Sequence, residues 1–450
     1  MIRTRYMDHI KANWHLAYPV MLSQLGHVMM GVTDSIMVGH IGSTSLAAVS
    51  LSNVIFNVLL LFGIGVSYAI TPLVAEAVGS NNNNHKVHIV RHGLIINLTN
   101  GIILVGLVTL GKNLLFKIGQ PEEVVSQAIP FLSIITYSII PVLIFQTYRQ
   151  FAEGMSFTRI AMIVMLVSNV VNILLNYVLI FGHAGFPAMG LLGAAWATLA
   201  SRIFMAAFII LYIYYSSKFK DLNGLFAFGQ YSKKIFAKML HIGIPAGMQF
   251  IFEVLAFDIS AVMMGWLGTQ ALAAHQIAIN MATISYMMTS GLAAAATIRV
   301  GYFFGKQDGT NLRVSAFSLL GMAISLMSVW AFIFILGKNI LPGFYISDPE
   351  VIAIATPLLV IAGIFQLSDG VQVVCAGALR GLQDVKIPSA FIFIAYWIIG
   401  LPLGYWLGFK GGLRATGIWM GLLVGLTLTA TAMFFRFNLL SKQIRRTSAE

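Results

Sequence analysis

The chain has 450 residues, of which 58% are hydrophobic and 9% are charged, and its mean hydropathy is +0.86. Soluble globular domains are about 45–50% apolar and about 25% charged, so this composition excludes an ordinary soluble protein and predicts a chain that crosses a membrane many times. The formal net charge of +12 does not indicate a nucleic-acid partner, because the basic residues fall in short gaps between apolar runs and the lipid bilayer accounts for them.

Apolar runs separated by Gly, Pro, Asn or charged residues predict twelve membrane-spanning helices. The first run follows basic residues and has no cleavage pattern of small residues, so we expect an uncleaved span rather than a signal peptide. The expected ranges, in chain order, are 14–38, 47–78, 92–111, 126–149, 160–182, 188–215, 239–266, 272–303, 313–337, 351–378, 387–409 and 414–438. The lysine-rich gap 216–238 is expected to connect two halves along the cytoplasmic surface.

Lys and Arg residues are distributed unequally between the two sides of the predicted membrane. If the N-terminus is cytoplasmic, Arg202 lies within a span and most of the other Lys and Arg residues are cytoplasmic. Only five fall on the opposite side: Lys112, Lys117, Lys338, Lys410 and Arg414. The positive-inside rule therefore predicts that both termini lie in the cytoplasm and that the protein occupies a bacterial plasma (inner) membrane.

The two halves of the sequence repeat each other. At an offset of 226 residues Pro19 matches Pro245 and Gly39 matches Gly265, while Leu46-Ala-Ala48 matches Leu272-Ala-Ala274. Six spans per half is an even number, so the repeats are parallel and related by an axis along the membrane normal. We therefore expect an all-α fold of two six-helix lobes around a central cavity, with an N-lobe at 1–215, a connector at 216–238 and a C-lobe at 239–450. Transporters of this kind place substrate and ion sites at or near the repeat interface.

Carboxylates within the spans are the first candidates for function, because an acidic residue at a helix centre costs about 2.5–3.5 kcal/mol in insertion experiments. Glu253 and Asp258 lie in the seventh span, five residues apart, so they point in different directions. Asp34 ends a polar stripe in the first span, and Asp369 belongs to one in the tenth. Gln24 and His27 share the stripe of Asp34, and Gln366 and Gln372 share that of Asp369, while in the seventh span Gln249 and Ser260 share a face with Glu253. For Gln and Ser, hydrogen bonding between helices is the more common role, and His27 is more often a packed histidine than a ligand.

Amide and hydroxyl groups accompany Asp34. The fifth span contains Asn169, Asn172 and Asn176, and the sixth contains Thr198. Oxygen donors suit a hard cation such as Na⁺. Alternatively, a carboxylate removed from water holds a proton more readily and can exchange it near neutral pH. The sequence leaves Na⁺ and H⁺ as equal alternatives.

An enzyme is not expected. The spans contain no HExxH, GxSxG or Cys/His set, and the single cysteine, Cys375, excludes an intramolecular disulfide and a cysteine-based metal cluster. We expect no cofactor other than a coupling ion.

The sequence resembles the multidrug and toxic compound extrusion (MATE) family, in its NorM-like branch, over essentially the whole chain. The motifs that carry the resemblance are Val32-Thr-Asp-Ser-Ile-Met-Val-Gly-His-Ile-Gly42, Phe252-Glu253, Asn172-Ile-Leu-Leu-Asn-Tyr-Val-Leu-Ile-Phe-Gly182 and Gly377-Ala-Leu-Arg-Gly-Leu-Gln-Asp384. The resemblance implies a monomeric antiporter that expels cationic, lipophilic compounds by alternating access, driven by inward Na⁺ or H⁺. It implies a C-lobe cation site at Glu253 and Asp369 with Tyr286 nearby. It also implies an N-lobe site at Asp34, Asn172, Asn176 and Thr198 with Tyr137 adjacent.

Substrate contacts are expected in an acidic cavity with aromatic walls, which would attract an organic cation through charge and cation–π interactions. The candidates, besides Tyr286, are Asp258, Gln249, Phe252, Phe257, Phe365, Gln366, Gln24 and His27. Asp258 departs from the family pattern, so its role as a substrate contact or as a neighbour that tunes Glu253 is open.

Two other transporter classes remain as alternatives. A major facilitator porter also has two parallel six-helix halves, but its basic Gly-x-x-x-Asp-Arg pattern is replaced here by Gly79-Ser-Asn-Asn-Asn-Asn-His-Lys86. A lipid or oligosaccharide flippase of the same superfamily is expected to have a cationic cavity rather than an acidic one.

Overall fold

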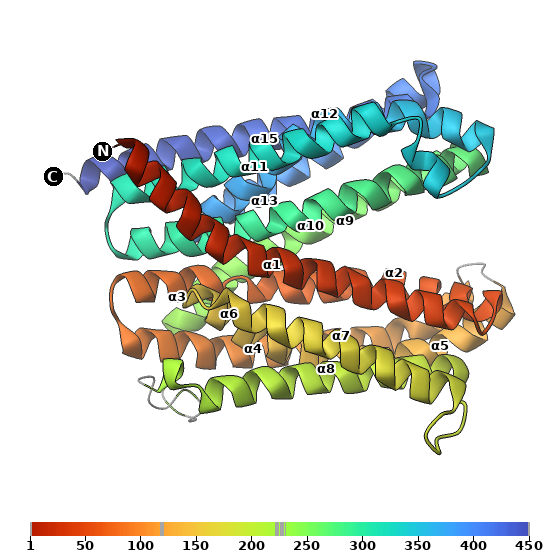
Figure 1. Ribbon diagram of the computed structural model, residues 1–450, viewed down its shortest axis with the longest axis horizontal. Helices are drawn as coiled ribbons and strands as arrows, with labels where there is room; N and C mark the ends of the chain where they lie inside the picture. The colour runs from red at the N-terminus through yellow and green to blue at the C-terminus, as the bar shows by residue number, and fades with distance from the viewer. Residues whose placement is uncertain (1, 118–120, 221–224, 226–228, 230, 449–450) are drawn as a thin grey trace. The chain divides into compact units, whose positions relative to one another are not determined.

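The computed structural model describes residues 2–117, 121–220, 225, 229 and 231–448, and within these residues the fold is built from helices (Figure 1). The first half contains α1 (Ile2–Gly39), α2 (Ser43–Ser67), α3 (Ile70–Gly79), α4 (Asn83–Gly111), η1 (Lys112–Lys117), α5 (Glu122–Tyr137), α6 (Ile139–Gly154), α7 (Thr158–Phe181), α8 (Gly190–Tyr215) and η2 (Ser217–Phe219). The second half contains α9 (Lys233–Leu267), α10 (Thr269–Gly305), α11 (Gly309–Gly337), η3 (Leu341–Phe344), α12 (Pro349–Gly381), α13 (Lys386–Ile392), η4 (Phe393–Gly400), α14 (Leu401–Tyr405), η5 (Trp406–Lys410) and α15 (Arg414–Thr447).

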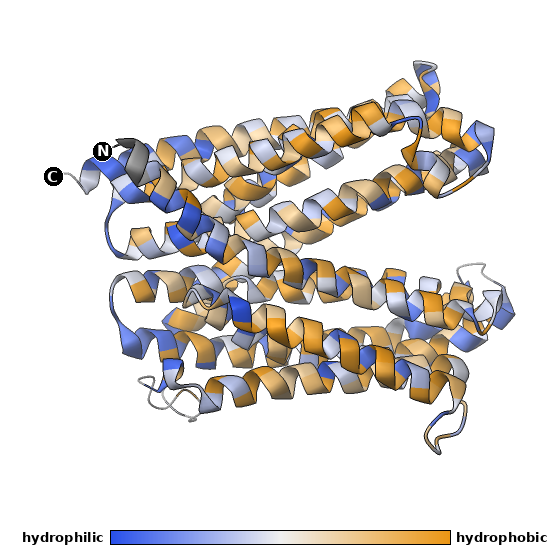
Figure 2. Cartoon of the chain, in the orientation of Figure 1, coloured by the Kyte–Doolittle hydropathy of each residue, from blue (hydrophilic) through white to orange (hydrophobic). Residues whose placement is uncertain are grey.

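Eleven helical segments in the described part of the chain are long and apolar enough to cross a membrane, beginning with Ser43–Gly79 and ending with Arg414–Thr447. The remaining long helix, α1, has 38 residues, but polar side chains such as Gln24, His27 and Asp34 lower its mean hydropathy. Figure 2 shows hydrophobic residues along the lengths of the helices and hydrophilic ones near the connections. The predicted all-α, polytopic fold with six spans in each half is confirmed, and most predicted spans agree with the observed helices to within a few residues.

Prolines explain where two spans break in the middle. Proline has no N–H and its ring clashes with the carbonyl four residues earlier, so it interrupts a helix on its N-terminal side. Pro72 follows the break between α2 and α3, and Pro141 follows the break at Ser138 between α5 and α6. Pro402 lies just after η4, which is π-helical and continues the same span without a turn.

The chain divides into two compact units. The N-unit comprises Leu22–Val74 and Asn81–Gly247, and the C-unit comprises Met1–Met21, Ala75–Ser80 and Met248–Glu450. The division falls within α1 after Met21 and within α9 after Gly247, which are equivalent positions at the repeat offset of 226. The expected lobe boundaries at 215 and 239 follow the sequence repeat, whereas packing places the first half of α1 and the end of α3 in the C-unit. Asp221–Gly224 and several later residues of the expected connector lie outside the described residues.

The two repeats use the same contacts inside their own units. In the N-unit the Thr71 hydroxyl donates to the backbone oxygen of Gln150 at 3.1 Å. In the C-unit the Thr297 hydroxyl donates to the backbone oxygen of Gly377 at 2.9 Å. Thr71 and Thr297 are 226 residues apart, and their acceptors are 227 apart. The sequence repeat is therefore also a repeat of helix packing.

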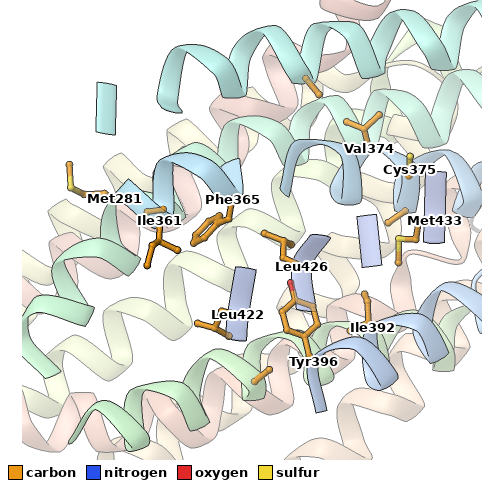
Figure 3. Packing of buried hydrophobic residues seen from close by; sticks show 14 of the residues in the cluster. Met281, Ile361, Phe365, Val374, Cys375, Ile392, Tyr396, Leu422, Leu426 and Met433 are labelled. Carbon is orange, nitrogen blue, oxygen red and sulfur yellow. The ribbon is translucent and has the colours of Figure 1, made fainter. Parts of the chain in front are cut away.

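The core of the C-unit is a cluster of buried apolar side chains from the first half of α1 and from the helices between α9 and α15. Figure 3 shows Tyr396 of η4 among Ile392, Leu422 and Leu426 in this cluster. Tyr396 is fully buried. A buried phenol needs a hydrogen-bond partner for its hydroxyl. For Tyr396 this partner is Gln372, which also contacts the predicted carboxylate Glu253.

Candidate functional site

In the N-unit, Asp34 of α1 accepts two hydrogen bonds from neighbouring helices. Its Oδ1 accepts from the Asn176 side-chain amide of α7 at 2.5 Å, and its Oδ2 accepts from the Thr198 hydroxyl of α8 at 3.2 Å. The Asn176 amide also donates to Asn172 Oδ1 at 3.2 Å, and the Asn172 amide donates to the Ser201 hydroxyl at 3.5 Å. Three helices therefore supply one hydrogen-bonded group around a half-buried carboxylate.

Helix periodicity and one glycine explain this assembly. Asn172 and Asn176 are one turn apart on α7, so they occupy the same face, and both are fully buried. A side chain at Gly193 would place its Cβ against the backbone of Leu179 and Ile180, so glycine lets α8 approach α7 closely. This close approach brings Thr198 within reach of a carboxylate on α1.

The group made of Asp34, Asn172, Asn176 and Thr198 has a donor set that fits a hard cation. All four side chains carry oxygen, which suits Na⁺-like ions and not soft metals. Asn176 Oδ1 is buried and has no hydrogen-bond partner in the described part of the chain, so one acceptor is left over. The same carboxylate can also take up a proton, and its two donors hold it in a fixed position for either ion.

Other residues predicted near Asp34 lie around this group rather than in it. Tyr137, the last residue of α5, is 55% exposed, and within the described residues it makes no hydrogen bond to Asp34. Arg202 donates to the Ser138 hydroxyl at 2.6 Å and lies over the Phe56 ring, and its charge acts on Asp34. Gln24 Oε1 accepts from Arg149 at 3.4 Å, and His27 lines a cavity of about 10 Å³ beside Arg202.

In the C-unit, Glu253 of α9 is held by a chain of hydrogen bonds. Glu253 Oε1 accepts from the Gln372 amide of α12 at 2.8 Å, and Gln372 Oε1 accepts from the Tyr396 hydroxyl at 3.4 Å. Gln372 and Tyr396 are both buried. The second predicted carboxylate, Asp369, is 7% exposed, lies on the same helix as Gln372, and interacts electrostatically with Glu253. The two predicted C-lobe carboxylates are therefore close to each other, with Asp369 buried and Glu253 partly buried.

Near this carboxylate pair, the side-chain amide of Gln366 lacks hydrogen-bond partners among the described residues. Gln366 lies one turn before Asp369 on α12 and is fully buried, yet neither its Oε1 nor its Nε2 has a hydrogen-bond partner among the described residues. Buried polar groups are nearly always satisfied, so an unpartnered amide indicates a place for a water or an ion. Gln249, another predicted site residue, is buried on α9 one turn before Glu253. Carboxylate and amide oxygens again form a set suited to a hard cation.

The predicted aromatic residues pack mainly on other rings of the C-unit. Phe252 contacts the Phe393 ring at 5.0 Å, Phe257 contacts Tyr396 at 6.1 Å, and Phe365 stacks on Trp419 at 5.6 Å. Phe365 is buried, as Figure 3 shows. These rings support the helices around Glu253 and Asp369, and their contact with substrate stays a prediction.

Tyr286 of α10 belongs to the electrostatic surroundings of Tyr396, together with the two carboxylates. Asp258 is separate from this group. It is exposed, whereas Glu253 is hydrogen bonded inside the unit, so the prediction that the two acids of α9 point in different directions is confirmed.

Two residues of the groups described above were not among the predicted site residues. Ser201 lies one turn after Thr198 and accepts from Asn172, and its helical spacing from Thr198 was a usable signal. Tyr396 lies in the apolar run of the eleventh span, where its sequence gives no sign that its hydroxyl reaches Gln372.

Comparison with known proteins shows which family this chain belongs to. The family model MatE matches residues 19–178 and 245–406, once in each repeat. The chain is 36% identical over 446 residues to the probable multidrug resistance protein NorM of Rhizobium meliloti, covering 98% of this chain and 95% of that protein. It is 32% identical over 446 residues to the multidrug resistance protein MdtK of Yersinia pseudotuberculosis, covering 98% and 97%.

Solved structures share the fold. A MATE transporter in a bent conformation aligns with a TM-score of 0.90 at 19% identity, covering 100% of this chain and 99% of that one. The eukaryotic MATE transporter AtDTX14 aligns with a TM-score of 0.87 at 20% identity, covering 99% and 100%. At these identities the likeness concerns the fold.

Proposed function

This chain belongs to the MatE family of membrane transporters, and we propose that it is a multidrug efflux antiporter that exports lipophilic organic cations in exchange for inward Na⁺ or H⁺. It is a multi-pass transporter and not an enzyme. The observation that carries the proposal is a pair of carboxylate sites inside the spans. Amide and hydroxyl donors hold Asp34, and an amide donor holds Glu253, which has Asp369 in its electrostatic surroundings. Charges in such places are costly, and in membrane proteins they mark ion and substrate pathways.

In the proposed mechanism, a cation entering from outside neutralises a carboxylate group and favours release of the bound drug. Glu253, held by Gln372, and Asp369 would bind the ion in one lobe, and Asp34 with Asn176 and Thr198 would bind it in the other. Alternating access of two lobes would then carry drug out and ion in. One elementary charge that moves down 100 mV releases about 2.3 kcal/mol, which sustains a concentration ratio of roughly fiftyfold.

Measurements of ion flux in proteoliposomes test the proposal and identify the ion. Purified protein is reconstituted with an imposed gradient of Na⁺ alone or of H⁺ alone, and ethidium uptake and ion flux are recorded together. We expect ethidium to trigger flux of at least one ion, and E253Q and D369N to lower gradient-driven transport by about tenfold or more, because each removes a charge that the ion must neutralise.

The matched control is E123Q, which removes a carboxylate charge from an exposed position in the first turn of α5. This variant is expected to transport at the wild-type rate. Wild-type rates in both E253Q and D369N would move the coupling site away from the C-unit. Absence of ethidium transport by the wild-type protein under every gradient would overturn the proposed export of organic cations.

A further inference from the structure

Asp258 differs from the three carboxylates assigned above to the two ion sites. Glu253 and Asp369 belong to the inner group of the C-unit, and Asp34 is held by two donors in the N-unit. Asp258 is exposed on α9, and no side chain in the described part of the chain donates a hydrogen bond to it. The ion site described above therefore gives this carboxylate no role.

The depth of Asp258 in the membrane decides what its exposed side faces. It lies ten residues before Gly268, the turn between α9 and α10, and at 1.5 Å per residue this places it about 15 Å from the turn. That is close to the middle of a hydrocarbon layer about 30 Å thick. A carboxylate facing lipid at this depth would be strongly unfavourable. The exposed side of α9 at Asp258 therefore faces water.

The partner helix of this hairpin is also polar at the same depth. Gln276 and Asn280 of α10 lie eight and twelve residues after Gly268, and both are exposed. Among the described residues their side chains bond only to each other, because the Gln276 amide donates to Asn280 Oδ1 at 3.0 Å. Lipid offers no hydrogen-bond partner for such side chains. Asp258 on α9 and the Gln276–Asn280 pair on α10 are thus exposed polar groups at a similar depth on the two helices of this hairpin.

In the N-unit, the face of α1 that is equivalent to the Asp258 face of α9 is also exposed. Val32, the equivalent of Asp258 at the offset of 226, lines an open groove of about 670 Å³ between α1 and α2, together with Ile36 and Leu46. Val32 and Ile36 are 51% and 57% exposed, and Val262, the equivalent of Ile36, is 53% exposed. The same face is therefore open in each unit, but only the C-unit carries an acid at this position.

We propose that Asp258 binds the positively charged group of the transported substrate. An organic cation contacts the Asp258 carboxylate on the open face of α9, at the depth where α10 exposes Gln276 and Asn280. Glu253 lies five residues away, about 140° around the same helix, and binds the coupling ion. The substrate and the coupling ion therefore bind to different carboxylates, on two sides of α9. This proposal rests on the proposed function, because it specifies how that function selects cations.

Binding to the purified full-length protein tests the proposal without transport. Tetraphenylphosphonium and its neutral analogue triphenylphosphine oxide are compared by competition against a fluorescent ligand. We expect D258N to raise the Kd of tetraphenylphosphonium about tenfold, because one charge–charge contact on a partly solvated face is lost. The Kd of triphenylphosphine oxide should change less than about twofold. D258E, which keeps the charge, should restore most of the cation affinity.

E123Q again controls for net charge, and it should leave both Kd values unchanged. Equal weakening of both ligands by D258N would show a structural role and overturn the proposal, as would an unchanged Kd for tetraphenylphosphonium. The half-saturating concentration of the coupling ion provides a second readout, which D258N should leave as in wild type. Wild-type protein that binds tetraphenylphosphonium through Asp258 but never exports it would refute the proposed function and not this inference.

Discussion

At the scale of single residues, Asp34 illustrates how a span can tolerate an acid. The carboxylate has a donor on each oxygen, from Asn176 and from Thr198, and each donor comes from a different helix. Hydrogen bonds to a charged group contribute more than neutral ones, and loss of one donor exposes the full desolvation penalty of the carboxylate. The shorter bond, from Asn176, should therefore matter most for the stability of the N-unit.

Replacing this donor should destabilise the protein, and exchanging the pair should restore it. We expect N176A to lower the free energy of unfolding by about 1–3 kcal/mol, because Asp34 loses its closest partner. The double variant D34N/N176D keeps one carboxylate and one amide in contact and should regain most of that loss. Thermal unfolding in detergent measures the change.

Transport separates stability from function in the same variants. D34N/N176D should remain poor in gradient-driven transport, because its carboxylate has moved from α1 to α7. Wild-type transport by the exchanged pair would reduce Asp34 to a helix-packing residue. No recovery of stability would show that the position of the charge, rather than the pairing, holds the three helices together.

At the scale of elements, glycines set how closely helices approach within each unit. A Cβ at Gly154, the last residue of α6, would lie 2.8 Å from Val74 Cβ. A Cβ at Gly381, the last residue of α12, would lie 2.8 Å from Val300 Cβ. Val74 and Val300 are 226 residues apart, so both repeats pack a helix end against the same side chain. Neither contact leaves space for a methyl group.

Alanine at these glycines should destabilise the protein, and the chain offers matched controls. We expect G154A and G381A each to cost about 1–3 kcal/mol, because a packed valine and nearby backbone must move. Gly106 of α4 and Gly321 of α11 have open space at the Cβ position, so G106A and G321A should be neutral or gain up to about 1 kcal/mol in helix propensity. Thermal unfolding of the four variants compares them, and equal effects in all four would contradict close packing as the cause.

At the scale of the whole molecule, the distribution of Lys and Arg predicts orientation. The only cysteine, Cys375, is fully buried, so it should not react with thiol reagents while the protein is folded. Single cysteines introduced at exposed positions can therefore report which side of the membrane they occupy. Asn82 lies between α3 and α4, and Asn113 lies in η1 at the other end of α4.

A membrane-impermeant maleimide should distinguish these two positions. In intact cells we expect N113C to be labelled and N82C to be protected, and in inverted vesicles the pattern should reverse, because both termini are predicted to be cytoplasmic. The wild-type protein should remain unlabelled in both preparations. The opposite labelling pattern would invert the topology, and labelling of the wild type would show that Cys375 is accessible.

The sequence alone determined the membrane class, the spans, the repeat and the residues that carry charge into the membrane. These follow from local composition and from a fixed offset, because about 20 apolar residues are needed to cross a bilayer wherever they occur. Pro19 and Pro245 revealed the duplication, and the cost of charge in lipid singled out Asp34, Glu253, Asp258 and Asp369.

Only the tertiary structure decided which of these residues act together. Helix periodicity predicted which faces of their helices carry Asp34 and Asn176. It did not predict that α8 approaches α7 closely at Gly193, which brings Thr198 into contact with Asp34. It predicted that the two acids of α9 point in different directions. It did not predict that Glu253 accepts a hydrogen bond from Gln372 while Asp258 is exposed. The physical reason is that a helix's own sequence fixes the directions of its side chains, whereas their partners depend on the packing of helices far apart in the chain.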